Sequence, residues 1–167
     1  MKHTIYWIER KFPGRLGIVL RPRGNDWLDD EIRSWKEEGI DIAISLLTHD
    51  EETELGLVQE KTISKKSGIE FHSFPIPDRG TPKPNNGFIK LAGKTLQKLH
   101  QGKTAVIHCR QSVGRSSLLA TAILIEDGMT GEEAIKSVHK ARKVEVPETK
   151  EQREWILSVA DAYSHKR

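Results

Sequence analysis

The segment from residue 104 to residue 127 constrains the fold most, because its pattern changes from strand to helix within a few residues. Residues 104–108 form a short apolar run that is typical of a buried strand, and residues 115–127 form an apolar run long enough for a helix. Between them lies a polar loop, residues 109–114, that ends in glycine. The segment therefore predicts a strand, a tight loop and a helix in succession, which is the local unit of α/β folds.

The rest of the chain alternates in the same way between short strand patterns and helix patterns. Apolar or alternating runs predict strands over residues 4–9, 16–20, 40–47 and 70–76. Helical periodicity predicts helices over residues 27–38, 49–60, 86–100, 149–163 and onward from 130, where Thr130 to Glu133 forms a capping box. We therefore predict an α/β sandwich in a single domain, residues 1–167, with a mainly parallel central sheet flanked by helices.

Two details of this pattern bear on later results. Trp27, Leu28, Ile32 and Trp35 can share one face of the first helix, which Gly39 would end. The segment 75–84 contains four prolines and one glycine, so no regular structure is expected there.

Composition excludes several classes of protein. The chain is 36% hydrophobic and 31% charged, and no run approaches the ~20 apolar residues of a membrane helix. Its first twenty residues are interrupted by charges, Pro13 and Gly14, unlike a signal peptide, so a cytoplasmic location is expected. One cysteine can form neither an internal disulfide nor a multi-cysteine zinc site. The net charge of +3 is spread along the chain without the basic patch of a nucleic-acid binder.

Cys109 and Arg115 stand at the two ends of the loop, with five residues between them. A loop that enters a helix turns backbone N–H groups inward, and the positive end of the helix adds to their attraction for phosphate. The same field favours the thiolate form of Cys109, and the planar guanidinium of Arg115 can bind two phosphate oxygens. The loop thus predicts a nucleophile, Cys109, and a phosphate site formed by Arg115 with the backbone of Arg110, Gln111, Ser112, Val113 and Gly114.

This pair also has a purely structural explanation. Isolated cysteines are often inert core residues, and an arginine at this spacing is weak evidence by itself. The apolar strand before the loop, the glycine within it and the apolar helix behind it favour the catalytic interpretation.

His108-Cys109-x5-Arg115-Ser116 resembles the active-site motif of the protein tyrosine and dual-specificity phosphatases. Pro77-Asp78 resembles their general-acid loop, and residues 142–152 resemble a segment of the small atypical dual-specificity phosphatases. The resemblance implies a phosphatase-type sandwich that hydrolyses phosphomonoesters without a metal or other cofactor. Many members have glycine where this chain has Ser112, and serine would be strained there if the position needs a positive φ.

The resemblance also implies roles that compete with simpler explanations. Asp78 would be the general acid, although aspartate is also a good turn residue in this context. The Ser116 hydroxyl would stabilise the thiolate, although serine is common in a first helical turn. His108 would hold the loop. Gln152 would position the attacking water, although with Thr149 it also forms a capping box.

A cluster of cations, Lys140, Arg142 and Lys143, follows the predicted helix that begins near residue 130. It predicts either a basic rim that attracts acidic substrates or a solvated helix end.

The implied reaction has two steps. The Cys109 thiolate attacks phosphorus while Asp78 protonates the leaving group, and water then hydrolyses the phosphocysteine with Asp78 as base. The expected substrate is a phosphorylated protein or peptide carrying phosphotyrosine, with phosphoserine and phosphothreonine as further candidates. The chain is expected to be a monomer, and neither a membrane nor nucleic acid is expected as a partner.

Three alternatives stay open at this point. The loop could belong to a phosphate-binding module with little turnover, or to a phosphatase for a non-protein substrate such as a phosphoinositide, a nucleotide or RNA. A sulfurtransferase or an arsenate reductase could use the same cradle, but a reductase ordinarily needs further cysteines to resolve its intermediate.

Overall fold

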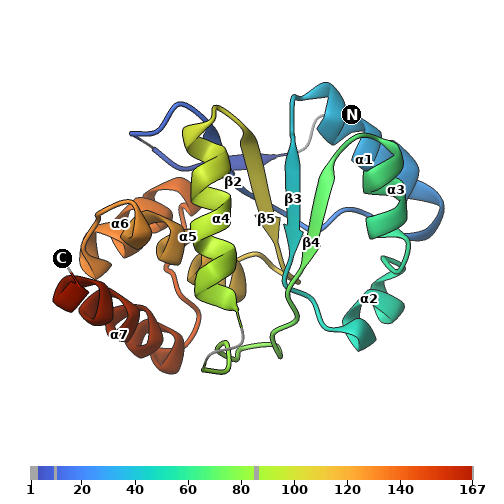
Figure 1. Cartoon of the computed structure of the whole chain (residues 1–167). Coiled ribbons are helices and arrows are strands. Elements are labelled where there is room, and N and C mark those ends of the chain that lie inside the picture. Colours follow the sequence, from blue (N-terminus) through green and yellow to red (C-terminus); the bar gives the residue numbers. More distant parts are fainter. Residues whose placement is uncertain (1–3, 10, 85–86, 167) are drawn as a thin grey trace.

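A five-stranded sheet forms the centre of the computed structural model, which describes residues 4–9, 11–84 and 87–166 (Figure 1). The strand order is β1-β2-β5-β3-β4, and only the β1–β2 pair is antiparallel. The predicted mainly parallel α/β sandwich is therefore confirmed. The strands are β1 (Ile5–Trp7), β2 (Arg15–Val19), β3 (Ile42–Ser45), β4 (Glu70–Ser73) and β5 (Thr104–His108).

Helices cover both faces of this sheet (Figure 1). One face carries four helices: α4 (Phe88–His100), α5 (Gly114–Glu126), α6 (Gly131–Arg142) and α7 (Lys150–Lys166). The other side carries α1 (Leu28–Glu37), α2 (His49–Leu55) and α3 (Glu60–Lys66). Within the part of the chain that the structure describes, none of these helices combines the length and hydrophobicity needed to cross a bilayer.

The inner strands β3 and β5 are buried on both faces because each face of the sheet supports its own core. In β5, Ala105 and Ile107 pack into the core beneath α5, whereas Val106 points into the core beneath α1. Helix α5 is buried along nearly its whole length. The predicted run of residues 104–127 thus becomes the centre of the molecule, with the loop at the carboxyl end of β5, where ligands bind in open α/β sheets.

Two predictions about helices are wrong. The expected helix over residues 49–60 ends at Leu55, because Gly56 adopts a left-handed conformation (φ 71°), and a separate helix that was not predicted, α3, begins at Glu60. Trp27 does not share the buried face of Leu28, Ile32 and Trp35. It belongs to a short 3-10 turn (Asn25–Trp27) before α1, is 54% exposed, and packs against the Arg23 guanidinium.

Other expectations hold to within a few residues. The Thr130 capping box is present at the start of α6, and the proline-rich segment 75–84 forms no helix or strand. Helix α4 begins at Phe88, and Asn86, where the prediction began, lies outside the described residues.

Candidate active site

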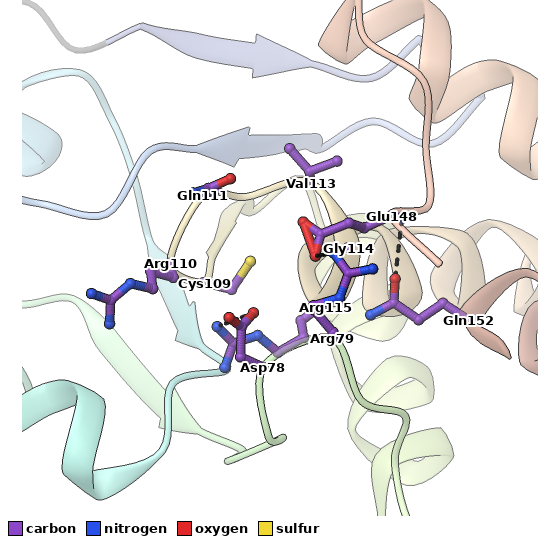
Figure 2. A pocket seen from close by; sticks show the side chains of 10 residues that line it. All are labelled: Asp78, Arg79, Cys109, Arg110, Gln111, Val113, Gly114, Arg115, Glu148 and Gln152. Carbon is purple, nitrogen blue, oxygen red and sulfur yellow. Dashed lines mark hydrogen bonds and ion pairs between the residues drawn. The ribbon is translucent and has the colours of Figure 1, made fainter. Parts of the chain in front are cut away.

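Most of the predicted site residues meet in one pocket of about 200 Å³ at the carboxyl end of β5 (Figure 2). The loop from Cys109 to Arg115 forms its floor, and the turn that carries Asp78 lies opposite. Ser112, Ser116 and His108 do not line the pocket but lie buried behind it. The lining residues are Asp78, Arg79, Cys109, Arg110, Gln111, Val113, Gly114, Arg115, Glu148 and Gln152.

Cys109 is 3% exposed and is held by two serines of its own segment. The Ser116 hydroxyl, in the first turn of α5, donates to the Cys109 sulfur at 3.2 Å. The Cys109 backbone N–H donates to Ser112 Oγ at 3.3 Å. The Cys109 sulfur thus receives a hydroxyl donor and lies near the N-terminus of α5.

Ser112 does adopt the backbone conformation that favours glycine, with φ 56°. Its side chain is fully buried and donates to the Val19 carbonyl at 2.7 Å while it accepts from Cys109. The bond to Val19 joins the loop to the end of β2, the bond from Cys109 closes the loop on itself, and together they offset the strain of a left-handed serine.

Arg142 lies beneath the loop, so for this residue both the basic rim and the solvated helix end are wrong. It is 7% exposed, its Nε donates to the Ser112 carbonyl at 2.8 Å, and its guanidinium stacks 4.2 Å from the centre of the Tyr6 ring. A second donor reaches the Gln111 carbonyl at 3.5 Å. Arg142 therefore satisfies carbonyl groups on the side of the loop away from the pocket. Lys140 and Lys143 are exposed.

Arg115 is held by an acid that the sequence analysis did not single out. Its two terminal nitrogens donate to the two carboxylate oxygens of Glu51 at 2.6 and 2.9 Å. Nη1 also donates to the Ile76 carbonyl at 2.7 Å. This bidentate pair fixes the plane of the guanidinium, which is 1% exposed, at the edge of the pocket.

Electrostatics of this buried pair favour full charge on both members. Burial acts to raise the pKa of Glu51, but hydrogen bonds from Arg115 and Thr48 outweigh it and lower the pKa to about 2. Burial acts to lower the pKa of Arg115, and the hydrogen bond to Glu51 together with the nearby Cys109 raises it instead. The site thus keeps a permanent cation beside the cysteine.

A second ion pair lies at the rim. Arg110 donates to the two carboxylate oxygens of Glu54 at 3.0 and 3.3 Å. Glu54 is three residues after Glu51 on α2, but its side chain is 63% exposed and that of Arg110 is 33% exposed. Helix α2 therefore contacts the loop through one buried ion pair, Glu51–Arg115, and one exposed ion pair, Glu54–Arg110.

Asp78 sits at the mouth of the pocket in a turn closed by a hydrogen bond from Gly80 N–H to the Pro77 carbonyl (2.8 Å). One of its carboxylate oxygens lies 3.4 Å from Arg115 Nη2, while its side chain remains 60% exposed. An acid in this place can reach a leaving group bound above Cys109.

The family model described as "Cyclin-dependent kinase inhibitor 3 (CDKN3)" matches residues 25–135, which include the acid turn, the loop and α5. The chain belongs to the CDKN3 family. This family is of the cysteine-dependent, dual-specificity phosphatase-like type, as the resemblance of the loop predicted.

Relatives of this CDKN3-family chain include two curated proteins. Cyclin-dependent kinase inhibitor 3 of Rattus norvegicus is 28% identical over 109 residues, 64% of this chain and 51% of that protein. Protein tyrosine phosphatase type IVA 2 of Mus musculus is 31% identical over 87 residues, 50% of this chain and 51% of that protein. The chain spans about half the length of the curated relatives it matches.

The fold of the CDKN3-family chain also matches solved structures. The crystal structure of kinase associated phosphatase, with its catalytic-site cysteine replaced by serine, superposes with a TM-score of 0.88 over 98% of this chain and 97% of that one. Sequence identity is 21%, so this match supports the fold. The active form of Tk-PTP matches with a TM-score of 0.74 at 24% identity, covering 96% of this chain and 99% of that one.

His108 and Gln152 have more partners than the sequence analysis assigned to them. His108 Nε2 lies 2.7 Å from Glu60 Oε2, and both side chains are buried. Gln152 has both hydrogen bonds of the predicted capping box with Thr149, and it also donates to the Gly80 carbonyl at 3.1 Å.

The sequence analysis missed five residues around the site: Glu51, Glu60, Arg79, Arg142 as a buried group, and Glu148. Arg79 and Glu148 form an ion pair of 3.1 Å at the pocket wall. One signal for the missed acids was available, because Gly56 between Glu51 and Glu60 indicates that the charged run is not one solvated helix.

Proposed function

We propose that this chain is a phosphomonoester hydrolase that uses Cys109 as nucleophile and forms a phosphocysteine intermediate. The observation that carries the proposal is the meeting of Cys109, Arg115 and Asp78 in one pocket at the N-terminus of α5. Family membership and the phosphatase relatives support a tyrosine-phosphatase-type enzyme.

In the first step, phosphate binds over the loop, where Arg115 and the N-terminus of α5 attract its oxygens. The Cys109 thiolate attacks phosphorus, the bond to the leaving oxygen breaks, and Asp78 gives that oxygen its proton. Ser116, already hydrogen-bonded to sulfur, stabilises the negative charge that returns to Cys109 in the second step.

In the second step, Asp78 accepts a proton from water as the water oxygen attacks phosphorus. The phosphorus–sulfur bond breaks, and inorganic phosphate leaves carrying one oxygen atom that came from the water. No redox change and no co-reactant other than water is needed. Positioning and charge stabilisation supply most of the rate in such phosphoryl transfers.

The proposed substrate class is a phosphorylated protein or peptide, with phosphotyrosine as the first candidate. The names of two similar proteins, kinase associated phosphatase and a protein tyrosine phosphatase, point to this class. Phosphoserine and phosphothreonine peptides are the second candidates.

The test is hydrolysis of p-nitrophenyl phosphate in the presence of a chelator, with wild type beside Cys109→Ser. We expect turnover by wild type and loss of all measurable turnover in the variant. Binding of phosphopeptides by a wild-type protein that does not turn over would instead support a phosphate-binding module.

A further inference from the structure

The acid turn, residues 77–80, is attached to the rest of the site through Gln152. We propose that Gln152 is a positioning residue for Asp78, and that it acts in the first chemical step rather than by orienting water in the second. This inference rests on the proposed function, because a position for Asp78 matters only if phosphate esters are cleaved.

Gln152 is fully buried and forms part of the wall of the pocket. Its Nε2 donates to the Gly80 carbonyl, two residues after Asp78, at 3.1 Å. On the other side of the aspartate, the Ile76 carbonyl, two residues before it, accepts from Arg115 at 2.7 Å. Asp78 is therefore held between two anchored carbonyl groups, and Gln152 supplies one of the two anchors.

The amide oxygen of Gln152 is already fully used. Oε1 accepts from the backbone N–H groups of Glu148 and Thr149, each at 3.1 Å. Figure 2 shows the bond with Glu148 as a dashed line. An amide oxygen has two lone pairs, so it has no capacity left to accept a hydrogen bond from an attacking water. Orienting that water through Oε1 would require a break in the cap of α7.

The same side chain also contacts the phosphate loop. A Cβ atom added to Gly114 would lie 2.7 Å from Gln152 Oε1 and 2.9 Å from Nε2, so the amide packs directly on the Gly114 backbone. Gln152 thus spans the phosphate loop, the acid turn and the start of α7. Gln152, with Arg115 at the other anchor, therefore helps to set the position of Asp78 relative to Cys109.

A weaker, exposed contact supports the same attachment. Arg79, next to Asp78, pairs with Glu148 at 3.1 Å, but its side chain is 63% exposed. Exposed ion pairs contribute little in water, so we assign the main anchoring role to the buried amide.

Gln152→Glu separates the role of this side chain in capping α7 from its role in anchoring the acid turn. Glutamate is the usual third residue of a capping box, so the cap of α7 is kept, but a carboxylate has no donor for the Gly80 carbonyl. The readout is kcat/KM for p-nitrophenyl phosphate divided by kcat/KM for an alkyl phosphate, whose poor leaving group depends on Asp78. This ratio cancels any general effect of the added charge on phosphate binding.

We expect the ratio to rise roughly tenfold in Gln152→Glu, a fraction of the roughly 10²–10⁴-fold that general acid catalysis contributes, because Asp78 is displaced and not removed. In the double variant Asp78→Asn with Gln152→Glu, the ratio should equal that of Asp78→Asn alone. Gln97→Ala, on the exposed face of α4, is the matched control and should leave the ratio unchanged. If Gln152→Glu does not fold, Gln152→Met, of similar length and without a donor, carries the same expectation.

An unchanged ratio would overturn the inference, above all if kcat falls alone and phosphocysteine accumulates. The term kcat/KM covers only the steps up to the first irreversible one, so a defect confined to hydrolysis of the intermediate leaves it intact. Failure of the proposed function gives a different result, since wild type itself would then show no turnover that depends on Cys109.

Discussion

The phosphate loop and the acid turn face each other across one pocket, yet they are held in very different ways. Three anchors of the loop are buried: Ser112 on Val19, Arg142 beneath the carbonyl groups, and Glu51 on Arg115. The acid turn exposes 60% of the Asp78 side chain and 63% of that of Arg79. Its anchors are the Gly80 and Ile76 carbonyl groups.

The difference follows the chemistry that each part would perform. A site for a phosphate dianion needs donors fixed in advance, because reorganisation during the reaction would cost rate. A general acid must meet leaving groups of different shape, and an exposed turn leaves room for them. Variants of the two regions should therefore differ in kind, since changes in the loop affect all substrates and changes in the turn affect some.

The largest effect is expected from Arg115→Lys. A lysine keeps the charge beside Glu51 but loses the planar fork that can hold two phosphate oxygens. We expect kcat/KM to fall roughly 10³-fold for aryl and alkyl phosphates alike, the scale seen when a transition-state donor is lost. Steady-state kinetics on both substrates measures it, and a loss confined to one substrate would contradict the assigned role.

Asp78→Asn should affect the two substrates unequally, whereas Arg115→Lys should affect them alike. Asparagine cannot give a proton to the leaving oxygen, so kcat/KM for an alkyl phosphate should fall about 10²-fold. For p-nitrophenyl phosphate, whose leaving group is already a weak base, the fall should be several times smaller. Equal losses on the two substrates would count against Asp78 as the acid.

Glu51→Ala tests the buried anchor against its exposed neighbour Glu54. Removing Glu51 leaves the buried Arg115 cation without its carboxylate partner. We expect the free energy of unfolding, measured by denaturant titration, to fall by about 3 kcal/mol. Glu54→Ala removes an exposed partner of Arg110 and should leave the unfolding midpoint nearly unchanged. Similar midpoints for the two variants would mean that burial does not distinguish the two pairs.

The pH dependence of stability gives a second readout of the same pair. The pKa of Glu51 falls from 4.5 to about 2 on folding, so its contribution is complete above about pH 4.5. That contribution should disappear as the pH falls toward 2, since protonation then favours the unfolded chain. The difference in free energy of unfolding between wild type and Glu51→Ala should therefore shrink as the pH falls over this range. A difference that stays constant would contradict the pairing.

The smallest effect concerns Ser112. Ser112→Ala keeps the positive φ and loses both side-chain hydrogen bonds, so we expect a loss of about 2 kcal/mol in unfolding free energy. Ser112→Gly loses the same bonds but removes the strain of about 1 kcal/mol or more, so it should be the more stable of the two. The reverse order would show that the backbone is not strained there.

Much of this arrangement could be predicted from local patterns. The strand, loop and helix around Cys109 and Arg115 are specified by neighbouring residues, and the structure has them within one residue of the predicted bounds. The general position of Asp78 came from the family resemblance, and its turn indeed lies at the pocket.

The anchors could not be predicted because they join distant parts of the chain. Glu51 lies 64 residues from Arg115, Glu60 lies 48 from His108, and Arg142 lies 30 from Ser112. Each stands in a charged stretch whose ordinary interpretation is a solvated surface. Burial of a charge depends on a partner that only the tertiary fold supplies.

The most direct test of the account is to look for the phosphocysteine itself. The chain has one cysteine, so intact-protein mass spectrometry after acid quench of a single turnover needs no assignment among thiols. We expect the mass of one added phosphoryl group on the intact wild-type chain, and none on Cys109→Ser. Turnover by wild type without any such adduct, while the Cys109→Ser variant remains active, would contradict the central claim.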